Sequence, residues 1–176
     1  MHRVSDQTVQ TELGEFRLCA YQDHVNGDVH IALARGHIDA TQVPLVRVHV
    51  ADTLRDLLGV RGDTRAWTLR AALERISRSG CGVVVVLREQ ETSSELISAL
   101  HTMSAPVEPL STTSQYAERA PTMSDERGGI LRTYGIGAQI LKDLGVRRMR
   151  VLSAPKQMHG ISAFDLEIEA YVSEES

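Results

Sequence analysis

The segment LVRVHVADTLRDLLGVRGDTRAWTLRAALERISRSGCGVVVVLR, residues 45–88, decides the fold class. It opens with LVRVHV, whose alternation of apolar and polar residues is typical of a half-buried strand. The spacing of Trp67, Ala71 and Ile76 then fits one face of an amphipathic helix that stops at Gly80. The β-branched run GVVVVLR that follows is typical of a buried parallel strand. Strand, helix and strand in this order predict a βαβ-like crossover.

Strand and helix patterns continue on both sides of this crossover. The further expected strands are EFRLCAY (15–21), HIALARG (30–36), MRVLS (149–153) and DLEIEAYV (165–172), the last an edge or half-exposed strand. Asn26-Gly27 between the first two favours a hairpin turn. Two more helices are expected, SSELISALHTM (93–103) with Ser93 or Ser94 as N-cap, and TYGIGAQILKDLG (133–145). The pattern as a whole predicts an α/β (α+β) fold, with a mixed sheet flanked by helices.

The length of 176 residues fits one domain with a sizeable core. We expect this domain to cover residues 14–172, with a linker at 1–13 and a tail at 173–176. Ser104 to Thr122 is rich in Ser, Thr, Pro and Glu without periodicity, which predicts a mobile loop.

The composition narrows the class of protein and its surroundings. A hydrophobic fraction of 42% and a charged fraction of 24% are those of a globular protein. A net charge of −4 gives no general attraction to nucleic acid or anionic lipid. No apolar run approaches the roughly 20 residues that span a bilayer, and MHRVSDQTVQ lacks the apolar core of a signal peptide. We therefore expect a cytoplasmic protein without membrane or nucleic-acid partners, in which Cys19 and Cys81 are buried free thiols.

Several segments together resemble the GTP cyclohydrolase II family. They are GEFR (14–17), GDVHIALARG (27–36), LVRVH (45–49), AALERI (71–76), RTYGIGAQILKDLGVRRMRVLS (132–153) and LEIEAYV (166–172). The most specific is YGIGAQILKDLGV, which in the family follows an arginine, as Arg132 does here. The resemblance implies a GTP cyclohydrolase II-like fold and a homodimer. In many bacteria such a domain is the C-terminal half of a riboflavin-biosynthesis protein whose N-terminal half is a 3,4-dihydroxy-2-butanone 4-phosphate synthase.

The resemblance also implies a zinc site, which this sequence departs from. In the family, three cysteine thiolates hold a zinc ion whose bound water attacks the imidazole ring of GTP. Arg47 and His49 match the start of the zinc-binding segment. Its three cysteine positions fall on Asp52, Asp63 and Arg65. Because a guanidinium repels a cation, we expect no zinc, no other metal and no cofactor. His49 with the two aspartates could still be imagined to hold a harder ion.

Other functional positions of the family are also changed. The E-G-R-G type loop that approaches the nucleotide phosphates corresponds to EQETSSEL (89–96), which keeps neither the glycines nor the arginine. The acidic residue expected two places before Arg132 is Ile130. Gly135-Ile136-Gly137 is not a dinucleotide fingerprint, and close helix packing explains it better. We therefore predict no catalytic residues.

Five basic residues survive from the family's nucleotide site. They are Arg47, His49, Arg88, Arg132 and Lys156. One interpretation is a residual cleft that still binds an anion or nucleotide. The other treats Arg47 and His49 as structural side chains of their strand.

Three functions then compete. The domain could be catalytically inactive and support or regulate a fused synthase, through dimer contacts or by sensing an anion. It could be an active GTP cyclohydrolase II acting on GTP. It could also be a new enzyme in the old cleft, with His49, Asp52 or Asp63 as general base. The lost thiolates favour the first.

Overall fold

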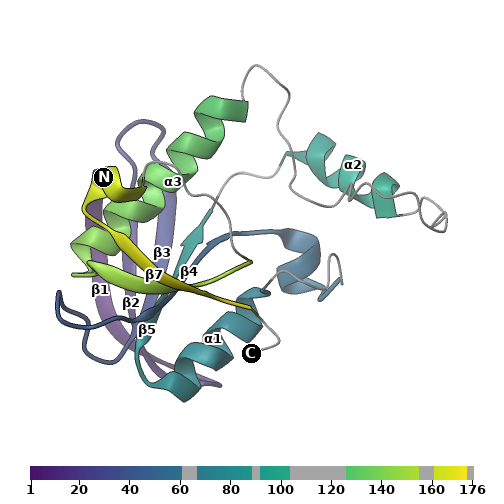
Figure 1. Cartoon of the computed structure of the whole chain (residues 1–176). Coiled ribbons are helices and arrows are strands. Elements are labelled where there is room, and N and C mark those ends of the chain that lie inside the picture. Colours follow the sequence, from purple (N-terminus) through teal and green to yellow (C-terminus); the bar gives the residue numbers. More distant parts are fainter. Residues whose placement is uncertain (61–66, 89–91, 104–125, 155–160, 174–176) are drawn as a thin grey trace.

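The computed structural model describes residues 1–60, 67–88, 92–103, 126–154 and 161–173 (Figure 1). Within them the strands form one sheet in the order β1-β2-β3-β5-β4-β6-β7. The strands are β1 (His2–Thr11), β2 (Gly14–Gln22), β3 (Val29–Arg35), β4 (Leu45–Val50), β5 (Gly82–Leu87), β6 (Arg148–Leu152) and β7 (Glu167–Val172). The helices are α1 (Leu69–Ser79), α2 (Ser93–Met103) and α3 (Glu126–Asp143), with short helical turns η1 (Thr53–Leu57) and η2 (Ile161–Phe164).

The sheet is mixed, as the sequence predicts. β1, β2, β3 and β5 pair antiparallel in succession, whereas β5, β4, β6 and β7 pair parallel. The predicted hairpin joins β2 to β3, and β7 forms an edge. Strand β4, helix α1 and strand β5 form the predicted crossover, with Leu45 opposite Gly82 and Val50 opposite Leu87.

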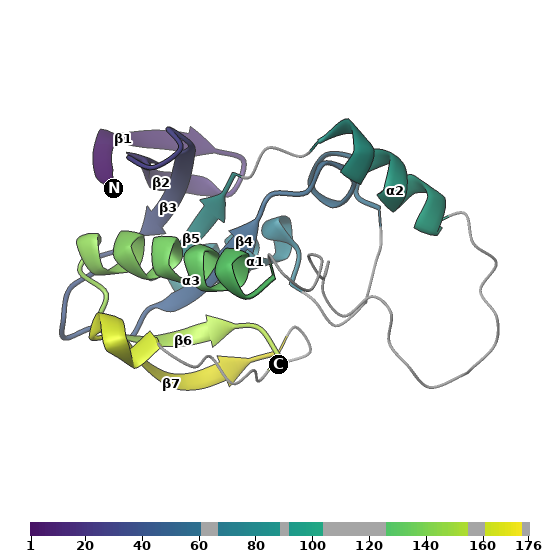
Figure 2. The same cartoon turned by 90° about the horizontal axis from the view of Figure 1, so that it is seen from above.

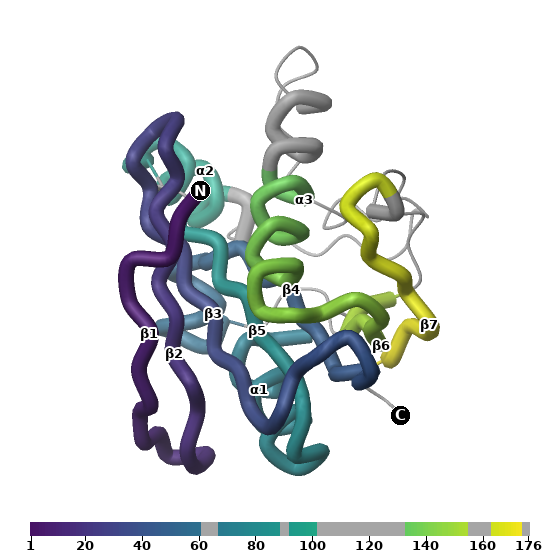
Figure 3. Tube along the Cα trace, turned by 90° about the vertical axis from the view of Figure 1, so that its left-hand side faces the viewer, coloured from purple at the N-terminus to yellow at the C-terminus, as the bar shows by residue number. Residues whose placement is uncertain are grey.

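Helices α1 and α3 cover opposite faces of the sheet (Figures 1 and 3). Because neighbouring strand residues point to opposite faces, Val83 and Val85 of β5 enter the core beneath α3, and Val84 enters the core beneath α1. On the α1 side, Ala72 and Ile76 of the helix are fully buried. Each helix therefore fixes one face of the central strands.

The boundaries of α1 follow from its sequence. The Thr68 side chain accepts a hydrogen bond from the Ala71 amide at 3.1 Å and caps the N-terminus. Gly80 ends the helix with φ 76°, a conformation that favours glycine. Trp67, which the sequence places on the helix face, precedes the helix but is buried in the same core.

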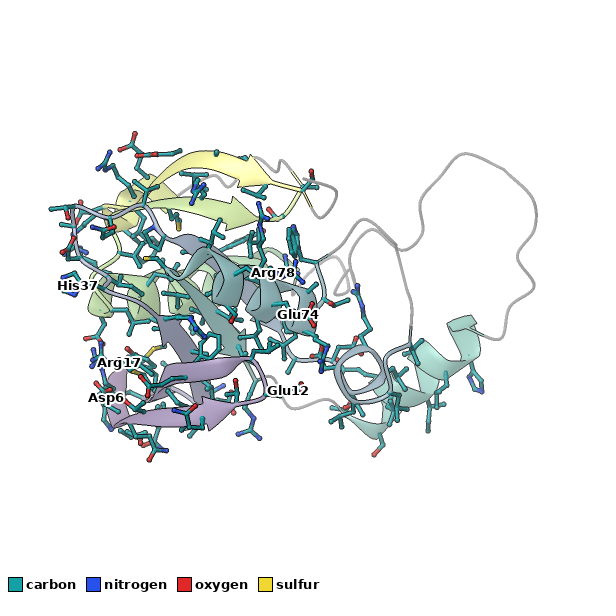
Figure 4. The ribbon with its side chains drawn as sticks, turned by 90° about the horizontal axis from the view of Figure 1, so that it is seen from below. Asp6, Glu12, Arg17, His37, Glu74 and Arg78 are labelled. Carbon is teal, nitrogen blue, oxygen red and sulfur yellow. The ribbon has the colours of Figure 1, made fainter. Side chains whose placement is uncertain are left out.

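The N-terminal residues differ from the prediction of a linker over 1–13, because His2–Thr11 form edge strand β1. Most β1 side chains are exposed, so its residues give no clear burial pattern to read. Pairing with β2 and ion pairs hold it instead. Asp6 accepts hydrogen bonds from Arg17 of β2 at 2.8 and 2.6 Å (Figure 4), and Arg3 donates to both Asp6 and Asp143 of α3.

The other two long helices are confirmed in place, with corrections at their ends. The capping side chain of α2 is Thr92 rather than Ser93 or Ser94. Its Oγ1 accepts from the Glu95 amide at 3.3 Å, and the Glu95 carboxylate accepts from the Thr92 amide at 2.8 Å. Helix α3 starts at Glu126, well before the predicted start at residue 133. The predicted mobile loop 104–122 and the predicted tail beyond residue 173 lie outside the described residues.

Cys19 and Cys81 are the two cysteines of the chain. Both thiols are free, with Cys19 fully buried as expected and Cys81 only partly so. Among the described helices, none is long and apolar enough to cross a membrane.

Candidate functional site

The candidate site lies where β4 ends and η1 begins. Arg47 and His49 are two residues apart on β4, so their side chains share the face of the sheet that α1 covers. Asp52, the N-cap of η1, lies two residues after the end of β4. The neighbouring strand β5 ends at the same edge, and Arg88 comes next. The parallel crossover therefore brings three sequence-predicted positions to one end of the sheet.

The Arg47 guanidinium joins three parts of the fold. Nη1 donates to the Leu152 carbonyl at the end of β6 at 3.0 Å, and Nη2 donates to the Trp67 carbonyl before α1 at 3.2 Å. Trp67 in turn donates from Nε1 to the Val172 carbonyl of β7 at 2.8 Å. This geometry supports the structural interpretation of Arg47.

His49 is 6% exposed and forms a close pair with Asp56 of η1. Its Nε2 lies 2.8 and 3.0 Å from the two carboxylate oxygens. Because an ionised carboxylate only accepts, Nε2 is the protonated nitrogen in this contact. Burial lowers the pKa of His49, although the Asp56 carboxylate acts in the opposite direction. His49 Nδ1 is buried and has no hydrogen-bond partner within the described part of the chain.

Asp52, which the resemblance to the family aligns with the first zinc thiolate, caps η1. Its carboxylate accepts from the Arg55 amide at 3.0 Å, and its own amide donates to Asp56 at 2.9 Å. Both aspartates are thus engaged in the turn that follows β4. Across the described ranges, no group of three His, Cys, Asp or Glu side chains is placed to hold a metal ion. Asp63 and Arg65 lie outside those ranges.

The remaining predicted residues are less closely placed. Arg88 is exposed, and its backbone amide donates to Nδ1 of buried His30 at 3.2 Å. Arg132 lies within α3, and Lys156 lies outside the described residues. The structure therefore brings Arg47 and His49 together and leaves the guanidinium of Arg88 accessible to solvent.

Two residues of this site are missing from the sequence predictions, Asp56 and Trp67 as a hydrogen-bonding residue. A carboxylate seven residues after a strand histidine has no recognised spacing. The pairing depends on the turn that Asp52 caps. An aspartate that accepts from the amide three residues later is a common N-cap arrangement, so Asp52 is the residue from which this turn could have been predicted.

The Gly135-Ile136-Gly137 segment packs closely, as predicted, but inside α3 rather than at its start. A Cβ on Gly137 would lie 3.2 Å from Cγ1 of Val48 on β4, which is closer than most such contacts. This close approach of α3 to β4 explains the glycine without a nucleotide.

The sheet order, the parallel crossover and the β4 end with its arginine and histidine define an α+β domain of the GTP cyclohydrolase II-like type. The model of that family, described as GTP cyclohydrolase II, matches residues 2–173, and the chain belongs to this family. A crystal structure described as RibBX, a two-domain 3,4-dihydroxy-2-butanone 4-phosphate synthase from A. baumannii, is similar in fold. Its TM-score is 0.65 at 30% identity, covering 97% of this chain and 40% of that one.

Curated relatives carry two kinds of name. A 3,4-dihydroxy-2-butanone 4-phosphate synthase of Pseudomonas aeruginosa is 42% identical over 99% of this chain and 44% of its own length. Another of Photobacterium phosphoreum is 38% identical over 98% and 43%. A riboflavin biosynthesis protein RibBA of Bacillus cereus is 34% identical over 94% and 41%. The chain thus spans less than half the length of these relatives.

Proposed function

We propose that this chain is a catalytically inactive GTP cyclohydrolase II-like domain of riboflavin biosynthesis. In this proposal it supports or regulates a 3,4-dihydroxy-2-butanone 4-phosphate synthase to which it is fused or with which it associates. The proposal has two parts. The first is the loss of the cyclohydrolase reaction, and the second is the support or regulation of a synthase.

The Asp52 carboxylate carries the first part. It stands where the family has a zinc thiolate, and its oxygen is engaged by the Arg55 amide. Zinc ligands in such sites must be free to point at one ion, and soft thiolates suit zinc better than a carboxylate already used as a cap. The neighbouring His49 is likewise held by Asp56. The end of β4 is therefore organised by internal hydrogen bonds.

The relatives support the second part. Relatives from two Pseudomonas species and from Photobacterium phosphoreum are named for the synthase reaction, although this chain matches less than half of their length. A solved structure that resembles the chain is also described as a two-domain synthase. Relatives that are named for the synthase reaction and contain a segment similar to this chain favour an accessory role for that segment.

Arg88 is the described residue best placed to keep an anion or nucleotide site. Its guanidinium is exposed at the end of β5, whereas Arg47 and His49 are engaged within the fold. In this proposal Arg88, Arg132 and Lys156 bind the anion or nucleotide. Arg47 and His49 stabilise the end of β4 through their contacts within the fold. A homodimer through this domain is also part of the proposal.

The His49–Asp56 pair favours a second candidate, a new enzyme that uses His49 as general base. A histidine oriented by a carboxylate is a common arrangement for proton transfer. In such pairs the nitrogen away from the carboxylate must reach the substrate. Here that nitrogen, Nδ1, is buried, which disfavours this candidate.

Two measurements test the proposal. Elemental analysis of the purified chain should find zinc well below one ion per molecule. In the longer protein that joins this chain to a synthase portion, removal of this chain should lower synthase turnover or change its response to anions. Stoichiometric zinc would overturn the first part. Unchanged synthase turnover and regulation would overturn the second.

A further inference from the structure

One end of the sheet gathers most of the exposed large apolar side chains of the described residues. The full set is Val4, Val25, Val50, Leu57, Leu58, Ile97, Leu100 and Tyr134, of which Val4 lies within β1 and Tyr134 within α3. Strand pairing places the others. Val50 ends β4, Leu57 ends η1 and Leu58 is the next residue, and α2 follows β5, which ends beside β4. The loop with Val25 joins β2 to β3 at the same end, since Ile31 of β3 pairs with Val86 of β5.

The exposure of these residues is large. Val25 is 81% exposed, Leu57 79% and Leu58 70%. At the opposite end of the sheet, the connections that the structure describes carry none of the exposed large apolar residues. A single exposed leucine is ordinary, whereas an apolar set gathered at one end of a domain marks an interaction surface. We call residues Val50, Leu57, Leu58, Ile97 and Leu100 the strand-end face.

Helix α2 also has exposed apolar residues. It stands away from the sheet and from α1 and α3 (Figures 1 and 2). Leu96 and Leu100 are four residues apart and Ile97 and Leu100 three residues apart, so these side chains lie along one side of the helix. A helix of 11 residues is at or below the length of about 12–15 residues at which isolated helices become marginal in water. Such a helix needs a partner against which its apolar side can pack.

We infer that the strand-end face is the surface on which the synthase portion of the longer protein docks. This inference rests on the proposed function and assigns it a surface. The relatives named as synthases are more than twice as long as the part this chain matches, since 44% of the Pseudomonas aeruginosa relative corresponds to 99% of this chain. More than half of such a protein therefore lies beyond this domain. A covalently joined partner is present at high effective concentration and so needs only a modest apolar surface.

The chemistry of the face indicates what the partner offers. Leucine, isoleucine and valine supply area without hydrogen bonds, so the partner surface should be apolar at its centre. Its rim should carry polar groups that meet Arg55 and His101. The protruding α2 fits a groove better than a flat surface, because its apolar stripe is narrow.

Hydrogen exchange of the α2 amides tests the inference. The 176-residue chain is compared with the longer protein that joins it to its synthase portion. We expect fast exchange in the chain alone and exchange slowed by about tenfold or more in the longer protein. The double substitution Leu57→Asp with Leu58→Asp, which lies outside α2, should abolish that slowing. Ala40→Asp with Gln42→Asp adds the same charge at the opposite end and should leave it unchanged.

Several results would overturn the inference. Slow exchange in the chain alone at every concentration would mean that the chain itself covers α2. Protection that grows with concentration would mean that a second copy does. Fast exchange in the longer protein, or slow exchange that survives the Leu57 and Leu58 changes, would also count against docking on this face. Zinc content and GTP turnover of the same samples test the proposed function separately.

Discussion

The Nε2 atom of His49 lies 2.8 Å from Oδ2 of Asp56, across the turn that joins β4 to η1. Asp56 also accepts from the Asp52 amide, and Asp52 caps the same turn. The three residues therefore hold each other in the turn after β4, which the resemblance to the family aligns with the start of its zinc-binding segment. This relationship gives the turn a defined conformation through internal hydrogen bonds.

The buried His49 predicts a pH dependence of stability. Burial lowers the pKa of His49 in the folded state, so the unfolded chain takes up a proton at higher pH than the folded chain. The contribution of neutral His49 to the free energy of unfolding should be fully present above the ordinary histidine pKa of about 6.5. It should be lost as the pH drops from there toward the folded-state pKa. His49→Asn should show a smaller loss of unfolding free energy between pH 7.5 and 5, measured with denaturant. A loss as steep as in the unaltered chain would contradict this.

Arg47 and Arg88 predict opposite outcomes for the same substitution. Arg47→Met leaves the Leu152 and Trp67 carbonyls without their donors, which should cost about 2–3 kcal/mol of unfolding free energy. Arg88→Met, at an exposed side chain, should change it by less than about 0.5 kcal/mol. Denaturant unfolding of both variants gives the comparison. Equal small effects would show that Arg47 is not structural.

Two glycines predict a packing contrast. A Cβ on Gly82 would lie 2.6 Å from the Leu45 carbonyl oxygen and 2.8 Å from Cγ1 of Ile76. Gly82→Ala should therefore destabilise the fold by about 1–3 kcal/mol. Gly135→Ala meets only an ordinary contact at 3.7 Å to Phe164 and removes a helix glycine, so it should be neutral or stabilise by up to about 1 kcal/mol. Thermal or denaturant unfolding measures the stability of both variants. A Gly82→Ala variant as stable as the Gly135→Ala variant would show that β5 can shift to make room for the added methyl group.

The alternating strands could be predicted because their burial can be read from single residues. Val46 and Val48 alternate with Arg47 and His49, and Val83 to Val86 are apolar throughout, so β4, β5 and the helix between them follow directly. β1 could not be predicted, because its side chains are mostly exposed and Asp6 depends on Arg17 of another strand. Its stability comes from pairing that no local pattern encodes.

The candidate site was only partly predictable for a related reason. Arg47 and His49 could be selected from the family resemblance, but the partners that decide their roles are distant or irregular. The Leu152 carbonyl is 105 residues from Arg47 along the chain. Asp56 lies in a helical turn that sequence periodicity did not indicate. Whether a basic residue faces a ligand or the fold depends on such tertiary contacts.

Restoring the thiolates separates the loss of metal from the loss of the whole site. The triple substitution Asp52→Cys, Asp63→Cys and Arg65→Cys should restore zinc binding without GTP turnover. Activity should stay absent because Ile130 and the EQETSSEL segment still lack the acid, glycines and arginine of the family. Loss of the Asp52 cap should cost about 1 kcal/mol of stability. Turnover by this variant would show that the cleft still recognises GTP.

Release of formate from GTP by the unaltered chain is the most direct test of the proposed inactivity. The purified chain is incubated with GTP and added zinc, beside a member of the family that keeps its three cysteines, and formate is measured over time. We predict formate at the level of a buffer blank, since Asp52, Asp63 and Arg65 occupy the thiolate positions. Zinc-dependent formate release above that blank would contradict the proposal.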